Sequence, residues 1–315
     1  MILRGIDFGS VWDASGVRNF FGEGYPFHRA FKSFGLNFDG STYGSETDPT
    51  NLGSGGGDMP LHGTMPRKLK PDCIVVKHRH GAVLNAVGLS GPGAEALFGG
   101  GRWQKRKKPF FLSFMAVGAT LSKRLDELNG FMRLCDRHLP EFRAKVGIQL
   151  NLSCPNTSHG ASDDVGEAKM MLAHLGIPIV PKFSVTTPVE TVARIAEHPA
   201  CDAVTVSNTV PWPKIAPDER ERIFGTQASP LEKYGGGGLS GAPLLPLVMD
   251  WLEEAQHAGF PKPIAAGGGI LRTVDGQQLF HRGADAVCLG SIAILRPWRV
   301  WHTVQTLKIY GRLSR

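Results

Sequence analysis

Short apolar runs rich in β-branched and aromatic residues recur along this sequence, and most are followed by a segment with apolar residues at helical spacing. This alternation favours parallel strands joined by crossover helices over an antiparallel sandwich. The strand candidates are residues 8–13, 36–42, 110–117, 146–153, 177–184, 203–208, 263–268 and 286–292. Their number, roughly eight, is the number that closes a parallel barrel. The sequence therefore predicts an α/β fold, a (β/α)8 TIM barrel.

Segments with apolar residues at helical spacing separate many of these runs, and they are expected to form the outer ring of the barrel. They are residues 121–137, 164–175, 188–197, 242–258, 273–282 and 297–307. Two long inserts, residues 43–109 and 209–239, interrupt the rhythm and are rich in glycine, proline and charge. Inserts of this length usually shape a functional site. We expect them near the C-terminal face of the strands.

Composition and cysteine usage bound the class of protein. With 315 residues, 42% of them hydrophobic, the chain can bury a large core, and residues 1–315 are predicted to form one domain. The five cysteines are scattered without CxxC or Cys/His metal spacing, so no metal site is predicted and a reducing, cytoplasmic location is expected. No signal peptide is evident, and no stretch approaches the roughly 20 apolar residues needed to cross a bilayer.

The chain carries an excess of positive charge. A formal net charge of +7 and an isoelectric point near 9.2 favour anionic ligands without choosing among them. The densest basic stretch, residues 102–108, could contact nucleic acid or a membrane surface, but a solvated loop before a strand is the favoured interpretation. We therefore expect a small-molecule substrate, and neither a nucleic-acid nor a membrane partner.

Polar residues gather where three predicted strands end, and in a parallel barrel these ends meet at one face. They are Asn151, Cys154 and Asn156 at the fourth run, Lys182 at the fifth, and Ser207, Asn208 and Thr209 at the sixth. A lysine at the end of an apolar strand favours a negative ligand, although a carboxylate such as Asp202 or Glu190 could pair with it.

Glycines after the last two strands allow backbone N–H groups to approach a phosphate, or serve only as tight turns.

The string Asn-Leu-Ser-Cys-Pro-Asn at residues 151–156 resembles the strand-end signature of dihydroorotate dehydrogenases. Further segments resemble other motifs of that family in the same order along the chain: residues 14–16, 84–89, 237–241, 267–270 and 289–291. The resemblance runs from about residue 8 to residue 296. It implies a flavin-dependent enzyme that binds FMN and oxidises dihydroorotate to orotate in pyrimidine biosynthesis.

The resemblance also implies a role for each matching residue. Cys154 is expected to be the general base that takes the C5 proton while the adjacent C6 hydride moves to flavin N5, and Lys182 to stabilise charge at the N1–O2 edge of the flavin. The implied substrate contacts are Asn85, Gly88, Leu89, Asn151, Asn156, Asn208 and Thr209. The implied FMN contacts are Ala14, Ser15, Gly16, Asn151, Lys182, Ser207, Gly238, Ser240, Gly241, Gly268, Gly269, Gly290 and Ser291.

Alternatives remain open at the level of the sequence. Residues 40–48 lack the lysine that many family members carry at the end of the second strand, although another cation such as Lys77 could substitute. This keeps another dihydropyrimidine or cyclic amide as an alternative substrate. A non-redox barrel that binds a phosphate ligand, as a lyase, isomerase or binding protein, is the alternative from a different class.

Family resemblance also bears on partners. The chain starts close to the first strand, which implies the soluble type rather than the membrane-bound type with an N-terminal helical extension. Soluble relatives commonly form dimers, and Trp298 and Trp301 in the last helical segment could contribute to a homodimer interface or to the core.

Overall fold

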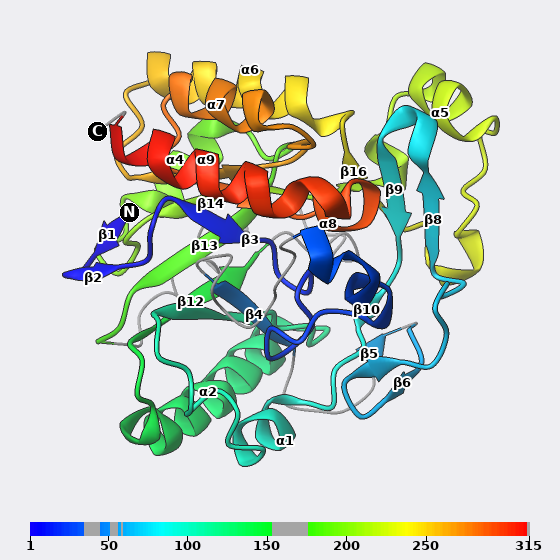
Figure 1. Ribbon diagram of the computed structural model, residues 1–315. Coiled ribbons are helices and arrows are strands. Elements are labelled where there is room, and N and C mark those ends of the chain that lie inside the picture. Colours follow the sequence, from blue (N-terminus) through cyan, green and yellow to red (C-terminus); the bar gives the residue numbers. More distant parts are fainter. Residues whose placement is uncertain (35–44, 51–55, 58, 153–175, 314–315) are drawn as a thin grey trace.

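The computed structural model describes residues 1–34, 45–50, 56–57, 59–152 and 176–313. Its centre is an eight-stranded sheet in which all paired neighbours are parallel. In spatial order the strands are β3 (Val11–Asp13), β18 (Ala286–Leu289), β17 (Ile264–Gly267), β14 (Val204–Asn208), β13 (Ile179–Ser184), β12 (Val146–Asn151), β11 (Phe110–Phe114) and β4 (Ser45–Thr50). The outermost strands β3 and β4 also lie next to each other, so the sheet curls into a barrel (Figure 1). The predicted fold class is confirmed.

Helices follow the strands and cover the outer side of the sheet (Figure 1). The longer ones are α2 (Leu121–His138), α4 (Val189–Ala196), α6 (Leu244–His257), α7 (Thr273–His281) and α9 (Val300–Leu313), and each overlaps a predicted helix. The helix predicted at 164–175 lies outside the described residues. Three further helices were not predicted from the sequence: α1 (Ala94–Gly99), α5 (Pro217–Phe224) and α8 (Ile292–Leu295). α1 and α8 are too short to show a spacing of apolar residues, and α5 is mostly charged, with Ile223 and Phe224 as its large apolar residues.

The second barrel strand lies elsewhere than predicted. The apolar run at 36–42 is predicted to form it, but the strand that pairs in parallel with β11 is β4. The sequence of β4, Ser-Glu-Thr-Asp-Pro-Thr, contains no apolar residue, so a search for apolar runs passes over it. Backbone pairing with β11, with a register shift between Leu112 and Phe114, holds it in the sheet. The run at 36–42 itself lies outside the described residues.

The two predicted inserts pair with each other. The first supplies β8 (Ile74–Lys77) and β9 (Ala82–Asn85), and the second leads into β15 (Val210–Pro211) and β16 (Gly238–Gly241). These strands form an antiparallel sheet in the order β15-β16-β9-β8, with α5 beside it (Figure 1). Its own apolar cluster includes Leu84, Trp212, Phe224 and Leu239. Two segments more than 100 residues apart in sequence therefore build one structure next to the barrel.

Short antiparallel strand pairs complete the sheet inventory of the described residues. They are β1 (Ile2–Leu3) with β2 (Ile6–Asp7), β5 (Gly56–Gly57) with β10 (Gly88–Leu89), and β6 (Leu61–His62) with β7 (Met65–Pro66).

Large apolar side chains close the barrel at the end where its strands begin. Trp12 and Phe111 are buried inside the barrel with ring centroids 4.6 Å apart, and Phe8 stacks on Phe111 at 4.1 Å. Met1 and Leu3, from the β1–β2 hairpin, pack into the same cluster. Because described side chains fill this end, a site in the barrel is expected at the opposite mouth.

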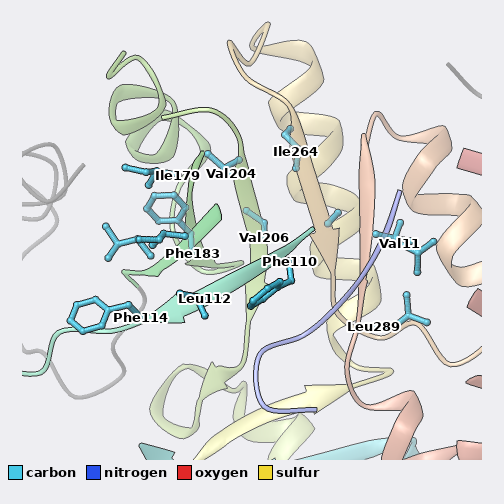
Figure 2. Close-up of a cluster of buried hydrophobic side chains, with 14 of the residues drawn as sticks. Val11, Phe110, Leu112, Phe114, Ile179, Phe183, Val204, Val206, Ile264 and Leu289 are labelled. Carbon is cyan, nitrogen blue, oxygen red and sulfur yellow. The ribbon is translucent and has the colours of Figure 1, made fainter. Parts of the chain in front are cut away.

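A second apolar layer fills the space between the strands and the outer helices. Figure 2 shows part of it, with Phe110, Leu112 and Phe114 of β11 among the labelled side chains. The Phe114 ring stacks on Phe131 of α2 with centroids 4.4 Å apart. This packing fixes the helices, and so fixes the loops that leave the carboxyl ends of the strands.

The C-terminal region presents aromatic side chains to solvent. Trp298 is 45% exposed and Trp301 is 47% exposed, which argues against the alternative that they belong to the core. Among the described helices, none has the length and apolar character that crossing a membrane requires.

Candidate active site

A cavity of about 690 Å³ opens at the carboxyl ends of the barrel strands, where they meet the sheet built from the inserts. Its size is typical of small-molecule and cofactor sites, and barrel enzymes hold their active sites at this face. Most of the predicted site residues line it. These are Ala14, Ser15, Gly16, Asn85, Gly88, Leu89, Asn151, Lys182, Ser207, Asn208, Thr209, Gly238, Ser240, Gly268, Gly269, Gly290 and Ser291.

Lys182 brings a cation into this cavity from the inner face of β13. Its side chain is only 6% exposed, and within the described ranges no carboxylate forms an ion pair with it. Asp202, one of the carboxylates considered as its partner, instead lies 2.8 Å from Arg4 and accepts a hydrogen bond from the backbone of Ile179. A buried cation that pairs with no described carboxylate favours an anion, or a group that gains negative charge, within the cavity.

The amide side chains at the strand ends are held in defined orientations. Asn208 Nδ2 donates to Asn151 Oδ1 at 3.2 Å, and Asn208 Oδ1 accepts from the backbone N–H of Thr209 at 2.9 Å. Asn85 Nδ2 lies 3.4 Å from the carbonyl oxygen of Gly238 in the neighbouring strand. The first two bonds fix the amides of β12 and β14, and the third fixes Asn85 within the insert sheet. All three asparagines line the cavity, and their amides suit a flat ring bearing both donors and acceptors.

Two glycine-containing turns after β17 and β18 present backbone donors. In the described part of the chain, the N–H groups of Gly268, Gly269, Gly290 and Ser291 meet no protein acceptor. Gly269 has φ +82°, and a Cβ there would lie 2.7 Å from the backbone nitrogen of Leu245, so packing against α6 also requires glycine. Packing against α6 therefore fixes the turn after β17, and both turns leave donors that can meet a phosphate.

Several predicted residues do not contribute to the described lining. Gly241 is absent from it; its φ is +105°, and a Cβ would lie 2.1 Å from Gly81 O, so the pairing of β16 with β9 explains this glycine. Lys77 also stays out of the cavity, with its ammonium 5.9 Å from the centre of the Phe224 ring. Cys154 and Asn156 lie outside the described residues.

Other lining residues were not predicted from the sequence. Thr205 and Cys288 point inward from β14 and β18, and alternation along those strands could have indicated them. Tyr25 and Phe27 come from the segment after β3, and Lys68 from the first insert. Lys68 is 60% exposed and lies 2.6 Å from Asp72. Nothing in the spacing of the sequence places Tyr25, Phe27 and Lys68 beside the strand ends.

A buried histidine fastens one wall of the cavity. The 3-10 helix η1 (Pro26–Phe34) carries His28, whose Nδ1 accepts from the backbone N–H of Tyr25 at 3.0 Å. With the proton on Nε2, that atom donates to Ala293 O in α8, also at 3.0 Å. Burial lowers the pKa of His28 to about 4. The neutral ring therefore ties the Tyr25–Phe27 wall to the helix that follows the β18 turn.

This shifted pKa predicts a loss of stability in mild acid. Because the folded pKa is below the unfolded value, stability is fully present above about pH 6.5 and falls as the pH approaches 4, by about 3 kcal/mol. Urea unfolding between pH 7.5 and 4 measures the free energy of unfolding. A His28→Gln variant should lose this part of the pH dependence, and a His257→Gln variant, changed at an exposed site, should keep it. Identical slopes in His28→Gln and the unmodified protein would refute the assignment.

Comparison with known proteins decides the family of this chain. Residues 62–308, most of the chain, match the family model described as Dihydroorotate dehydrogenase. The chain belongs to the dihydroorotate dehydrogenase family. It is therefore a flavin-dependent oxidoreductase of the class that acts on CH–CH groups.

Similar proteins of this family span much of the chain. It is 28% identical over 244 residues to "Dihydroorotate dehydrogenase B (NAD(+)), catalytic subunit" of Caldicellulosiruptor saccharolyticus, covering 73% of each chain. The similarly described protein of Thermodesulfovibrio yellowstonii is 27% identical over 236 residues, covering 72% of each. The crystal structure of ligand-free DHODH from Eimeria tenella matches 98% of this chain and 86% of its own, with a TM-score of 0.64 at 17% identity. This last likeness supports the fold alone.

The described site offers polar groups that suit an organic cofactor. No cluster of three or more His, Cys, Asp or Glu side chains able to hold a metal ion occurs in the part of this dihydroorotate dehydrogenase family member that the structure describes. The cavity offers instead a buried ammonium, fixed amides and free backbone donors.

Proposed function

We propose that this protein catalyses the FMN-dependent oxidation of dihydroorotate to orotate in pyrimidine biosynthesis. The observation that carries the proposal is the convergence of Lys182, the Asn151–Asn208 amides and two donor-bearing turns on one cavity of a dihydroorotate dehydrogenase family member. A small anionic ring and a phosphate-bearing cofactor both suit that combination.

The residues present fit FMN. The free N–H groups of Gly268, Gly269, Gly290 and Ser291 suit its phosphate, because backbone N–H groups at such turns bind anions. Lys182 suits the edge of the ring where charge accumulates, and residues 14–16 line the cavity next to the β18 turn, with Ala14 N donating to Leu289 O at 2.9 Å. When bound, FMN would supply the two-electron acceptor for the hydride that leaves the substrate.

The chain's own residues would supply the proton chemistry and the orientation. Cys154, which lies outside the described residues, would take the substrate proton as a thiolate. Asn85, Asn151, Asn156 and Asn208 would hold the substrate ring by its amide edges. Gly88, Leu89 and Thr209 would complete the substrate contacts, and Ser207, Gly238 and Ser240 those to the cofactor.

Two further parts of the proposal concern context. Residues 1–315 would form one FMN-binding barrel domain in the cytoplasm. A homodimer is proposed, and the exposed Trp298 and Trp301 are available to such an interface.

One observation favours a second substrate class. Residues 40–48 contain no lysine, and Lys77, the cation considered as its replacement, does not line the cavity. Lys68 does line the cavity, but its ammonium is paired with Asp72 at 2.6 Å. The absence of a lysine at residues 40–48 therefore favours an uncharged dihydropyrimidine or cyclic amide over the carboxylate of dihydroorotate.

Flavin binding tests the proposed function against a non-redox barrel. We expect the purified protein to bind FMN, to be yellow, and to lose the flavin absorbance when dihydroorotate is added without oxygen. Orotate should leave the absorbance unbleached and serves as the matched control. Colourless protein that binds no added FMN would reject the proposal and favour a lyase, isomerase or binding protein that takes another phosphate ligand.

A further inference from the structure

Beneath the strand-end amides, three buried polar side chains form a chain of hydrogen bonds across the barrel interior. Ser113 of β11 donates its hydroxyl to Gln149 Oε1 at 3.4 Å, and Gln149 Nε2 donates to Thr205 Oγ1 at 3.2 Å. The three side chains are 3%, 0% and 1% exposed. Of the three, Thr205 lines the cavity.

The direction of these bonds determines where the Thr205 proton points. Thr205 Oγ1 accepts from Gln149, so its own O–H must be directed elsewhere. Among the described residues, no protein atom accepts that proton. A buried donor without an acceptor is costly, and nearly all buried hydroxyls in proteins have one. The missing acceptor is therefore expected from whatever occupies the cavity.

The neighbour of Thr205 indicates which part of a ligand this would be. Lys182 and Thr205 are paired residues of the adjacent parallel strands β13 and β14, and both line the cavity. Their side chains therefore enter the cavity from neighbouring positions of the two strands. An ammonium and a hydroxyl donor that enter from neighbouring positions suit one edge of a ring that gains negative charge.

We propose that Ser113, Gln149 and Thr205 form a relay that points the Thr205 hydroxyl proton at the flavin edge faced by Lys182. Thr205 is then a ligand-contacting residue, and Gln149 is a positioning residue that acts through it. The relay rests on the proposed function, since it presumes that FMN occupies the cavity. Its effect is to stabilise the reduced, negatively charged ring more than the oxidised ring.

The midpoint potential of bound FMN, measured with a chemical reductant rather than substrate, tests the relay. Thr205→Val removes the hydroxyl with little change of shape, and we expect reduced FMN to lose about tenfold more affinity than oxidised FMN. For a two-electron couple, tenfold corresponds to a fall in potential of about 30 mV. Thr205→Ser should restore the potential. Thr303→Val, which removes a buried hydroxyl on α9 that does not line the cavity, is the matched control and should leave the potential unchanged.

A double-mutant cycle tests the role of Gln149. Gln149→Met should also lower the potential of bound FMN. The loss of affinity for reduced FMN relative to oxidised FMN should be severalfold smaller than in Thr205→Val. In the Thr205→Val background, Gln149→Met should cause no further change in the potential. An unchanged potential in Thr205→Val, no rescue by Thr205→Ser, or additive effects in the cycle would each overturn the relay.

The same experiment separates the relay from the proposed function. Wild-type protein that binds FMN but is not bleached by dihydroorotate contradicts the proposed substrate, while the potentials still decide the relay. Wild-type protein that binds no FMN overturns both.

Discussion

Replacing Cys154 with alanine is expected to leave FMN bound and to slow flavin reduction by dihydroorotate by a factor on the order of 10²–10⁴, the usual contribution of a general base. Rapid mixing under anaerobic conditions, with flavin absorbance as the signal, measures this rate. In the unmodified protein the rate should climb through the mildly alkaline range, because a free thiol has a pKa of about 8.5 and the thiolate is the base.

The other cysteines offer a matched control for this prediction. Cys288 lines the cavity, so Cys288→Ala tests whether any thiol near the site suffices. Burial raises the pKa of Cys201 to about 12, which keeps that thiol protonated over the tested range. A pH profile that is flat from acid to alkaline, or unchanged reduction kinetics in Cys154→Ala, would remove the assigned base.

The second large effect is expected from Lys182→Met, a change that removes the buried ammonium while keeping the length of the side chain. Loss of one preorganised group that stabilises developing charge typically costs a factor of about 10²–10³ in rate. We expect flavin reduction to slow by this amount and the midpoint potential of bound FMN to fall. Both are measured on the FMN-loaded protein, by rapid mixing and by reductive titration.

Lys77→Met is the matched control for this change, because Lys77 lies outside the cavity against the Phe224 ring. It should leave both the rate and the potential unchanged. Wild-type values in Lys182→Met, or equal losses in both variants, would show that Lys182 does not act on the cofactor.

The barrel could be predicted because its strands are buried on both faces and so read as apolar runs. Seven of the eight runs overlap a strand of the parallel sheet. The eighth run, at 36–42, lies outside the described residues, and the strand paired with β11 is β4. The polar sequence of β4 gives no apolar signal, and its place in the sheet depends on backbone pairing with β11. The sheet that joins the two inserts also escapes prediction, since its pairing of β9 with β16 links residues far apart in sequence.

The site was predictable where a residue lies at the end of a strand. Lys182 and the strand-end asparagines follow this rule, because parallel strands deliver their last residues to one face. Thr205 lies two residues before Ser207 on the same face of β14, so a search limited to strand ends misses it. Tyr25 and Lys68 reach the cavity from loops, and their position depends on tertiary contacts such as the His28 bond to Ala293. Gly241 shows the converse case, a motif glycine that strand pairing alone explains.

Anaerobic single-turnover reduction of the bound flavin by dihydroorotate, dihydrouracil and dihydrothymine decides whether dihydroorotate is the substrate of this protein. We expect dihydroorotate to bleach the flavin fastest and to yield one orotate for each flavin reduced. Faster bleaching by dihydrouracil or dihydrothymine, or bleaching by none of the three, would contradict it.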